Sequence, residues 1–383
     1  MNLQKKKVTY WSPHINKVAT VQAVYNSVKS LKNFSQEKFE PEIIDAFGEW
    51  EEFHNNDLNI NFYKLYKFKF LNRISSDGFI FSRIKYTLIF LLSSLPLTMY
   101  LLRKKPDYFI IHLITSLPLF LNYFFDFKTK IVLRISGKPQ LNFFRYFFWK
   151  ITLRKIYKIT FPTEETYQYF KKLNIVENDK LAILSDPIID SKKIIDKIKE
   201  KDEKDKNIEN YYLSIGRLTK QKNFSFLIDC FKNLNLSGNN SKLVIIGEGE
   251  EYKKLTQLIN SLNLQNNIFL VGYKKNVFTY LKKAKGFILS SLWEDPGFVL
   301  IEAIYSNTIV ISSDCPSGPK ELIGDRKGVL FKNNSHDDFI KKFNYLDNLS
   351  QIEIDKLRIN AKKNIKKFTI FNHYKVLTTS ILN

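Results

Sequence analysis

Short apolar runs alternate along the chain with longer amphipathic segments, and this alternation predicts β/α units. In the first half, the short runs predict strands at 8–11, 39–45, 108–113, 130–135, 158–161 and 181–184. The longer segments predict helices near 20–32, 86–102, 143–154 and 164–173. Strands that alternate with helices usually form a parallel sheet covered on both faces, so this half is expected to be a doubly wound α/β domain.

The second half repeats the pattern, with strands predicted at 211–215, 242–246, 268–271, 286–289 and 308–311. Helices are predicted between and after them, at 224–233, 251–262, 277–283, 299–305 and 320–322. We therefore expect two Rossmann-like domains that face a central cleft, at 1–185 and 208–362. The charged segment 186–207 reads as a linker, and a C-terminal helix within 363–383 is expected to pack back on the N-terminal domain.

Charge is distributed unevenly along this chain of 383 residues with a net charge of +22. Residues 58–163 contain eighteen Lys and Arg against three acids, which leaves +15 for this segment alone. The segment is also rich in aromatic residues, as in FYKLYKFKF and FFRYFFWKITLRKIYK. A basic aromatic surface suits an anionic membrane or single-stranded nucleic acid.

The location of the protein is predicted from three features of the sequence. The polar, basic start of the chain lacks the apolar core of a signal peptide, and Cys230 and Cys315 suggest neither a disulfide framework nor a zinc site. The 17 uncharged residues 86–102 are at the short limit for a spanning helix and contain Pro96, so we interpret them as a core helix. A cytoplasmic protein, peripheral at the inner face of the membrane, is expected.

Two glutamates, Glu294 and Glu302, lie in the stretch SSLWEDPGFVLIEAIYSN. Glu302 falls in an apolar run, and no Lys or Arg occurs between Glu294 and Lys320 to pair with it. A buried carboxylate needs a partner, and a ligand with hydroxyl groups would supply one. The alternative is a structural salt bridge to Glu302. The Pro296-Gly297 pair predicts a helix start, whose free N–H groups favour a phosphate. Together these features suggest a sugar nucleotide.

Other motifs follow predicted strands of the second half, at the edge where ligands gather in such sheets. Gly216 would allow close approach of the backbone, and Arg217 and Lys222 would converge on a diphosphate. Equally, these two cations are what an ordinary surface loop would carry. A further strand ends in Gly247-Glu248-Gly249, which lacks the third glycine of a dinucleotide fingerprint and predicts a tight turn. Another strand ends in Gly272-Tyr273, which faces a nucleobase or forms a plain turn.

Five segments of the second half occur in a fixed order: GRLTKQKN, IIGEGEEYKKL, FLVGYKKNV, SSLWEDPGFVLIEA and SSDCPSGPKEL. In this order they resemble the donor-binding half of glycosyltransferase family 4. The members of that family are retaining, metal-independent enzymes of the GT-B fold. The resemblance covers residues 211–321, whereas the N-terminal half agrees with the family only in its β/α layout.

The resemblance implies a role for each matching residue. Arg217 and Lys222 are similar to the basic pair that holds the donor diphosphate and stabilises the leaving group. Glu302 resembles the ribose-binding glutamate, and Glu294 resembles the glutamate that holds hydroxyls of the transferred sugar. The remaining donor-binding positions are Gly216, Gly247, Glu248 and Tyr273, together with a phosphate-binding helix start at Gly297, Phe298 and Val299.

The N-terminal half departs from the family pattern at two loops. The first loop, SPHINKVATVQ, has no glycine, and Asn16, Lys17 or Ala19 would replace its backbone contacts. A family His-Gly is replaced by Ser136-Gly137, with Arg134 nearby. His14, Lys17 and Ser136 are our acceptor-side candidates, and His14 and His112, at strand ends, either line the cleft or are structural.

The sequence thus predicts a retaining glycosyltransferase without cofactor or metal, which moves a sugar from a nucleoside-diphosphate donor to a glycan or lipid-linked saccharide. The expected pathway is the assembly of cell-surface polysaccharide or lipopolysaccharide. An anionic membrane is the expected further partner, through residues 58–163, and no nucleic acid is expected. The alternatives are a soluble acceptor, a basic nucleic-acid-binding protein, and a GT-B-shaped protein that has lost catalysis.

Overall fold

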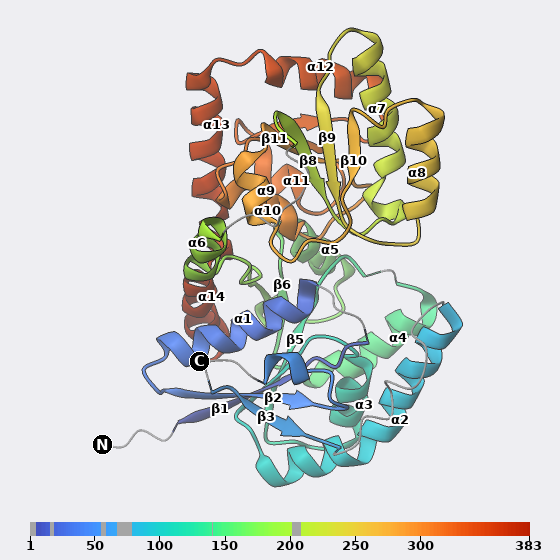
Figure 1. The fold of residues 1–383 in the computed structure, drawn as a ribbon. Helices are drawn as coiled ribbons and strands as arrows, with labels where there is room; N and C mark the ends of the chain where they lie inside the picture. Colours follow the sequence, from blue (N-terminus) through green and yellow to red (C-terminus); the bar gives the residue numbers. More distant parts are fainter. Residues whose placement is uncertain (1–4, 16–18, 55–58, 67–78, 140, 201–207) are drawn as a thin grey trace. The chain divides into compact units, whose positions relative to one another are not determined.

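The computed structural model describes residues 5–15, 19–54, 59–66, 79–139, 141–200 and 208–383. The chain forms two compact units, of which unit 1 comprises Met1–Pro187 with Ile370–Asn383, and unit 2 comprises Ile188–Thr369. Figure 1 shows a sheet with helices around it in each unit. Each sheet is parallel wherever its strands pair, and this confirms the predicted fold of two doubly wound α/β domains.

Unit 1 has a seven-stranded sheet in the order β3-β2-β1-β4-β5-β6-β7. Its strands are β1 (Lys6–Trp11), β2 (Phe39–Asp45), β3 (Asn61–Lys64), β4 (Tyr108–Ile111), β5 (Lys130–Arg134), β6 (Lys158–Phe161) and β7 (Leu181–Ile183). Its helices are α1 (Ala19–Phe34), α2 (Phe79–Lys104), α3 (Ser116–Phe124), α4 (Phe143–Thr152), α5 (Glu164–Leu173) and α14 (Ile370–Val376).

Unit 2 has a six-stranded sheet in the order β10-β9-β8-β11-β12-β13. Its strands are β8 (Tyr211–Ile215), β9 (Lys242–Ile246), β10 (Ile268–Leu270), β11 (Gly286–Leu289), β12 (Val310–Ser313) and β13 (Val329–Phe331). Its helices are α6 (Ser191–Lys199), α7 (Phe224–Leu236), α8 (Tyr252–Ser261), α9 (Phe278–Lys283), α10 (Phe298–Tyr305), α11 (Pro319–Ile323), α12 (His336–Asp347) and α13 (Gln351–Asn364).

Both faces of each sheet are buried, which explains why the central strands are continuous apolar runs. Successive side chains of a strand point to opposite faces. In β9, Leu243 and Ile245 therefore join one core of unit 2, whereas Val244 and Ile246 join the other. Because the strands are anchored on both sides, the loops at their carboxyl ends start from fixed positions.

The boundary between the units differs from the predicted linker at 186–207. Helix α6 lies inside that segment, and its Ile194 is buried in a core of unit 2 with Ile188 and Ile189. The segment resembles a linker in sequence because most side chains of this nine-residue helix are charged, and only Ile194 of the helix is buried. The second crossing falls after Thr369 rather than near residue 363.

The end of the chain is part of unit 1, where α14 packs on α1. His373 of α14 is buried, and its Nε2 lies 2.8 Å from the Ser27 hydroxyl while its Nδ1 lies 2.8 Å from the Ser185 carbonyl oxygen. The Nδ1–H therefore donates to Ser185, and Nε2 accepts from Ser27. Burial lowers the pKa of His373 to about 3, so the ring is neutral. This clamp holds the C-terminal helix against the first helix.

Helix α2 is longer than the predicted core helix and is buried on one face only. Ile89, Leu97 and Leu101 enter the core of unit 1, but over Arg83–Lys104 only 39% of the most apolar window is buried. Among the described residues, α2 is long and apolar enough to cross a membrane, judged by length and composition alone.

Candidate functional site

The loops that follow the strands of unit 2 are hydrogen-bonded to one another at the edge of the sheet. The Leu218 amide, after β8, donates to the carbonyl oxygen of Glu248, after β9, at 2.8 Å. The Leu292 amide, after β11, donates to the carbonyl oxygen of Gln221 at 2.8 Å. The carboxyl edge of this sheet, where ligands bind in doubly wound folds, is therefore a connected set of loops.

Two glycines permit the close approach of these loops. Gly247 has φ +150°, and a Cβ atom there would lie 1.9 Å from the Gly216 carbonyl oxygen. Gly249 has φ +158°, and its Cβ would lie 2.4 Å from the Leu218 carbonyl oxygen. No larger side chain fits at either position without moving the backbone. The Gly-x-Gly pair is thus a close-approach turn at the rim of the site.

A buried ion pair joins the loop after β8 to the loop after β11. Lys222 Nζ lies 2.5 Å from Glu294 Oε1; Glu294 is buried and Lys222 is largely buried, with exposed side-chain fractions of 7% and 13%. The Ser291 hydroxyl donates to the same carboxylate oxygen at 2.5 Å. The aliphatic stem of Lys222 lies over Gly216, where a Cβ atom would come within 3.0 Å of it. Two predicted catalytic residues therefore lie together, as one hydrogen-bonded group.

The backbone around Glu294 is held by the loop that follows β12. The Glu294 amide donates to the Pro316 carbonyl oxygen at 3.2 Å. Gly318 has φ +140°, and its Cβ would lie 2.1 Å from the Pro296 carbonyl oxygen. The peptide between Asp295 and Pro296 is cis. These contacts place the Pro-Gly turn directly beside the glutamate.

Helix α10 starts next to the ion pair. Gly297 is its N-cap residue with φ +93°, and a Cβ atom there would lie 3.8 Å from Glu294 Oε2. Among the described residues, no acceptor bonds the amides of Phe298 and Val299. The positive end of the helix dipole and these amides make the helix start a favourable place for an anion. The predicted phosphate seat and Glu294 are thus adjacent.

Arg217 is exposed, and the structure records no side-chain partner for it within the described ranges. It precedes the tight Leu218 contact, so its backbone is fixed while its guanidinium is available to a ligand. Glu248 is also exposed, and Tyr273 is 67% exposed. The carbonyl oxygen of Gly272 accepts from the Gly247 amide at 2.9 Å, which places Tyr273 at the same rim.

Glu302 lies one turn after the start of α10 and is mostly buried. Its carboxylate has no hydrogen-bond partner in the part of the chain that the structure describes. Burial raises the pKa of Glu302 to about 7, and Lys197 and Lys193 of α6 act in the opposite direction. The expectation of no nearby cation is therefore wrong: two lie on a helix within the predicted linker. Burial nevertheless outweighs them.

Ser136, an acceptor-side candidate in unit 1, belongs to a polar network with Arg134 and His112. The Ser136 hydroxyl lies 3.2 Å from His112 Nε2. Arg134 donates to the Leu184 carbonyl oxygen at 2.9 Å and forms an ion pair with Asp186. Burial lowers the pKa of His112 well below its usual value, so its ring is neutral. Arg134 and His112 are thus both buried in unit 1.

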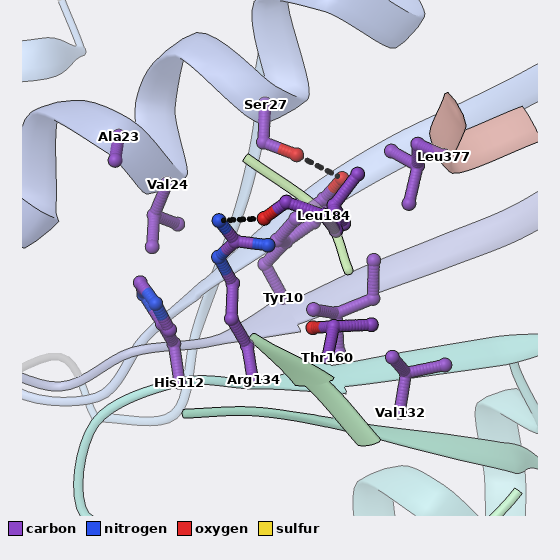
Figure 2. A pocket seen from close by; sticks show the side chains of 11 residues that line it. Tyr10, Ala23, Val24, Ser27, His112, Val132, Arg134, Thr160, Leu184 and Leu377 are labelled. Carbon is purple, nitrogen blue, oxygen red and sulfur yellow. Dashed lines mark hydrogen bonds between the residues drawn. The ribbon is translucent and has the colours of Figure 1, made fainter. Parts of the chain in front are cut away.

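Figure 2 shows the small cavity beside this network, with room for about one water molecule. Arg134 Nη1, His112 Nδ1 and Thr160 Oγ1 are buried here without a hydrogen-bond partner in the described parts of the chain. The rest of the lining is mainly apolar: Tyr10, Ala23, Val24, Ser27, Ile110, Val132, Leu184 and Leu377. A saccharide is far too large for this space, so the cavity is not an acceptor site.

His14 packs edge-on against Trp50 at 5.0 Å between ring centroids. Its Nδ1 lies 3.3 Å from the Ser12 carbonyl oxygen, and burial lowers its pKa. Asn16 and Lys17 lie outside the described residues, and Ala19 is the first residue of α1. The described residues contain no cluster of three or more His, Cys, Asp or Glu side chains able to hold a metal ion.

Sequence reasoning missed two residues that shape the site. Ser291 binds the Glu294 carboxylate, and Gly318 lets two loops touch. The signals were present, since Ser291 stands three residues before Glu294, and Gly318-Pro319 is a helix-start pair like Pro296-Gly297. A sequence does not show which of its many serines and glycines meet another loop.

The ion pair predicts a stability effect. In Lys222→Met, Glu294 stays buried without its cation, so we expect a loss of about 3 kcal/mol in the free energy of unfolding of unit 2. The double variant Lys222→Met/Glu294→Gln should recover most of it, because no buried charge remains. Urea unfolding measures this, with the exposed Lys220→Met as the control. Equal unfolding midpoints for Lys222→Met and Lys220→Met would contradict the prediction.

Glu302, in contrast, is predicted to destabilise the folded protein when its carboxyl group is ionised, so its effect on stability depends on pH. Its pKa is about 7 in the folded protein and near 4.5 when unfolded, so ionisation opposes folding from about pH 4.5 upward and fully above pH 7. Glu302→Gln removes this penalty and should stabilise the protein by about 1 to 2 kcal/mol at pH 8, but hardly at pH 4.5. Melting curves at both pH values check it against Glu248→Gln. A larger gain at low pH would disprove this.

Comparison with known proteins finds similarity in the half of the chain that contains this site. Residues 194–368 match the family model described as Glycosyl transferases group 1. An uncharacterized glycosyltransferase of Methanocaldococcus jannaschii is 49% identical over 112 residues, which are 29% of this chain and 28% of the relative. The N-acetylgalactosamine-N,N'-diacetylbacillosaminyl-diphospho-undecaprenol 4-alpha-N-acetylgalactosaminyltransferase of Campylobacter jejuni is 28% identical over 63% of this chain and 66% of its own length.

A solved structure extends the likeness to both units. TarM of Staphylococcus aureus, crystallised with fondaparinux, alpha-GlcNAc-glycerol and UDP, has a TM-score of 0.70 at 16% identity, over 98% of this chain and 99% of its own. The chain spans less than two thirds of the length of the two curated relatives. The match to the glycosyl transferases group 1 model is thus confined to residues 194–368, whereas the GT-B fold extends over the whole chain.

Proposed function

We propose that the protein is a retaining, metal-independent glycosyltransferase that uses a nucleoside-diphosphate-sugar donor. The observation that carries the proposal is the Lys222–Glu294 pair next to the start of α10 and to the exposed Arg217. This edge offers cations and free amides for a diphosphate, with a carboxylate beside them for hydroxyl groups. Uridine diphosphate is the first nucleotide to test, because TarM was crystallised with it.

In this proposal each group has one task. The Arg217 guanidinium and the amides of Phe298 and Val299 hold the diphosphate, and Lys222 adds a positive charge while it stays bonded to Glu294. Glu302 accepts hydrogen bonds from ribose hydroxyls, which the protein itself does not supply to it. Glu294 Oε2, which faces Gly297, accepts from hydroxyls of the transferred sugar. The substrate thus completes groups that the fold leaves incomplete.

The reaction proposed is a front-face displacement. The bond between the anomeric carbon and the leaving diphosphate oxygen breaks, and a bond from that carbon to the acceptor oxygen forms on the same side. The acceptor proton passes to an oxygen of the departing diphosphate. Negative charge develops on the diphosphate, so Arg217, Lys222 and the helix start stabilise the transition state more than the substrate.

The proposed acceptor is a glycan or a lipid-linked saccharide, in the assembly of a cell-surface polysaccharide at the inner face of the membrane. The name of the Campylobacter relative specifies a diphospho-undecaprenol acceptor, and the basic aromatic segment 58–163 suits a lipid surface. A soluble acceptor remains the alternative, and it would need no membrane surface on the enzyme.

Nucleotide binding tests the donor site. Uridine diphosphate near 100 times its dissociation constant should stabilise the wild type by about 2.7 kcal/mol, which is a rise of several degrees in melting temperature. Arg217→Ala and Glu302→Ala should respond less, whereas Lys282→Ala, an exposed cation on α9, should respond like the wild type. The rise should persist in a chelator. If no nucleotide in a panel of bases raises the melting temperature, the proposal fails.

The stereochemistry of the product tests the reaction. With an α-linked donor sugar and a lipid-linked disaccharide acceptor, the new glycosidic bond should be α, as shown by the proton coupling constant at the anomeric carbon. Arg217→Ala should lower kcat by about 10²-fold or more, because it removes charge stabilisation from the leaving group. A β product would refute retention, even if transfer is observed.

A further inference from the structure

The outward surfaces of α2, α3 and α4 in unit 1 expose large apolar side chains. Helix α2 contacts α3, and α3 contacts α4. The three helices lie together on one side of the sheet in Figure 1. Exposed members include Leu91 (63%), Leu95 (67%), Phe124 (63%), Phe143 (78%) and Phe144 (80%). A soluble monomer seldom exposes so continuous an apolar face, so this one needs an explanation.

The exposed residues of α2 form a stripe rather than a scatter. Ile84, Leu91, Leu95, Met99 and Leu102 are all exposed and are spaced by three, four or seven residues, so they lie along one side of the helix. The opposite side enters the core of unit 1. It also contains buried polar residues: Lys85, Ser93 and Thr98. Buried polar residues on this helix therefore lie opposite an exposed apolar stripe.

Helices α3 and α4 continue the stripe with aromatic rings. Phe120 of α3 lies 5.8 Å from Phe90 of α2 between ring centroids, and 4.8 Å from Phe124. Phe143 and Phe144 open α4, and Phe147 follows one turn later. The first turn of α4 thus projects two aromatic side chains, which is typical of helices that enter a lipid surface.

Positive charge surrounds this apolar face. From residue 83 to residue 155 the sequence has thirteen Lys and Arg, against only Asp107 and Asp126. Arg103, Lys104 and Lys105 end the stripe of α2 and are exposed, as are Arg145 and Lys150 of α4. Cations at the rim of an apolar surface match anionic headgroups above acyl chains.

A spanning role for α2 conflicts with its packing. Ile89, Leu97 and Leu101 are buried against the sheet, and Tyr100 bonds with Thr9 of β1 at 2.8 Å and with Glu42 of β2 at 2.5 Å. To cross a bilayer the helix would have to leave this core. It is therefore suited to lie at the surface of the membrane, with only its outer stripe in contact with lipid.

We propose that the outward face of α2, α3 and α4 is a membrane-docking surface that inserts its apolar side chains into an anionic bilayer. This assigns specific helices to the membrane association under the proposed function, but it does not depend on sugar transfer. A second copy of the chain is the competing occupant. It fits less well, because two surfaces with this excess of cations would repel each other.

Vesicle flotation tests the surface. Wild-type protein should float with phosphatidylglycerol vesicles, and less with phosphatidylcholine alone or at high salt. The variant Leu91→Ser/Leu95→Ser/Phe144→Ser should bind at least about tenfold more weakly, because it loses three inserted side chains. The control Leu236→Ser/Ile352→Ser/Ile359→Ser changes equally exposed residues of unit 2 and should bind like the wild type. Equal binding by both variants overturns the proposal.

Two further measurements separate this inference from its rivals. Phe144→Trp should be quenched by brominated phosphatidylglycerol more strongly than wild type is, and no added quenching overturns the insertion. If the wild type dimerises without vesicles, while the patch variant is monomeric and floats normally, the face is a self-association surface and the proposal is wrong. The melting response to uridine diphosphate, taken on the same samples, reports on the donor site separately.

Discussion

The buried pair between Lys222 and Glu294 is the contact on which the geometry of the site depends. It connects the loops after β8 and β11, and Ser291 adds a third group to the same carboxylate oxygen. Two charges removed from water gain little net stability from each other, so such a pair is weak evidence for a purely stabilising role. Its value here is position, since it fixes a carboxylate and an ammonium group beside the start of α10.

The two glutamates that look alike in the sequence meet opposite environments. Glu294 has Lys222 and Ser291, whereas Glu302 has no hydrogen-bond partner in the described chain and a raised pKa. The cost of burying the Glu294 carboxylate is therefore offset within the protein, by Lys222 and Ser291. The other carboxylate carries a burial cost that Lys197 and Lys193 offset only in part. Uncompensated burial of a carboxylate lowers the stability of the folded protein, and functional sites are where proteins commonly tolerate such a loss.

The sequence predicted the strands and the strand-end motifs of unit 2 because both are local. Strands buried on both faces are apolar runs, and Gly247 and Gly297 mark turns whatever surrounds them. What sequence reasoning could not supply was pairing across the fold. Lys222 meets Glu294 across 72 residues, and the cations near Glu302 come from a helix hidden in a charged segment. β3 and β13 were missed, and short length at a sheet edge does not explain this, since the three-residue edge strands β7 and β10 were predicted.

The helix α2 shows a second limit of sequence reasoning, and the reason is physical. A helix that is apolar on all sides satisfies the same pattern whether protein or lipid covers it. Our interpretation as a core helix was correct for the face with Ile89 and Leu97 and wrong for the face with Leu91 and Leu95. The hydropathy of a segment is a sum over both faces of the helix, whereas the burial of each side chain in the structure distinguishes one face from the other. On this helix Lys85 is buried and Leu95 is exposed, so the hydropathy of the whole segment does not show which of its sides enters the core.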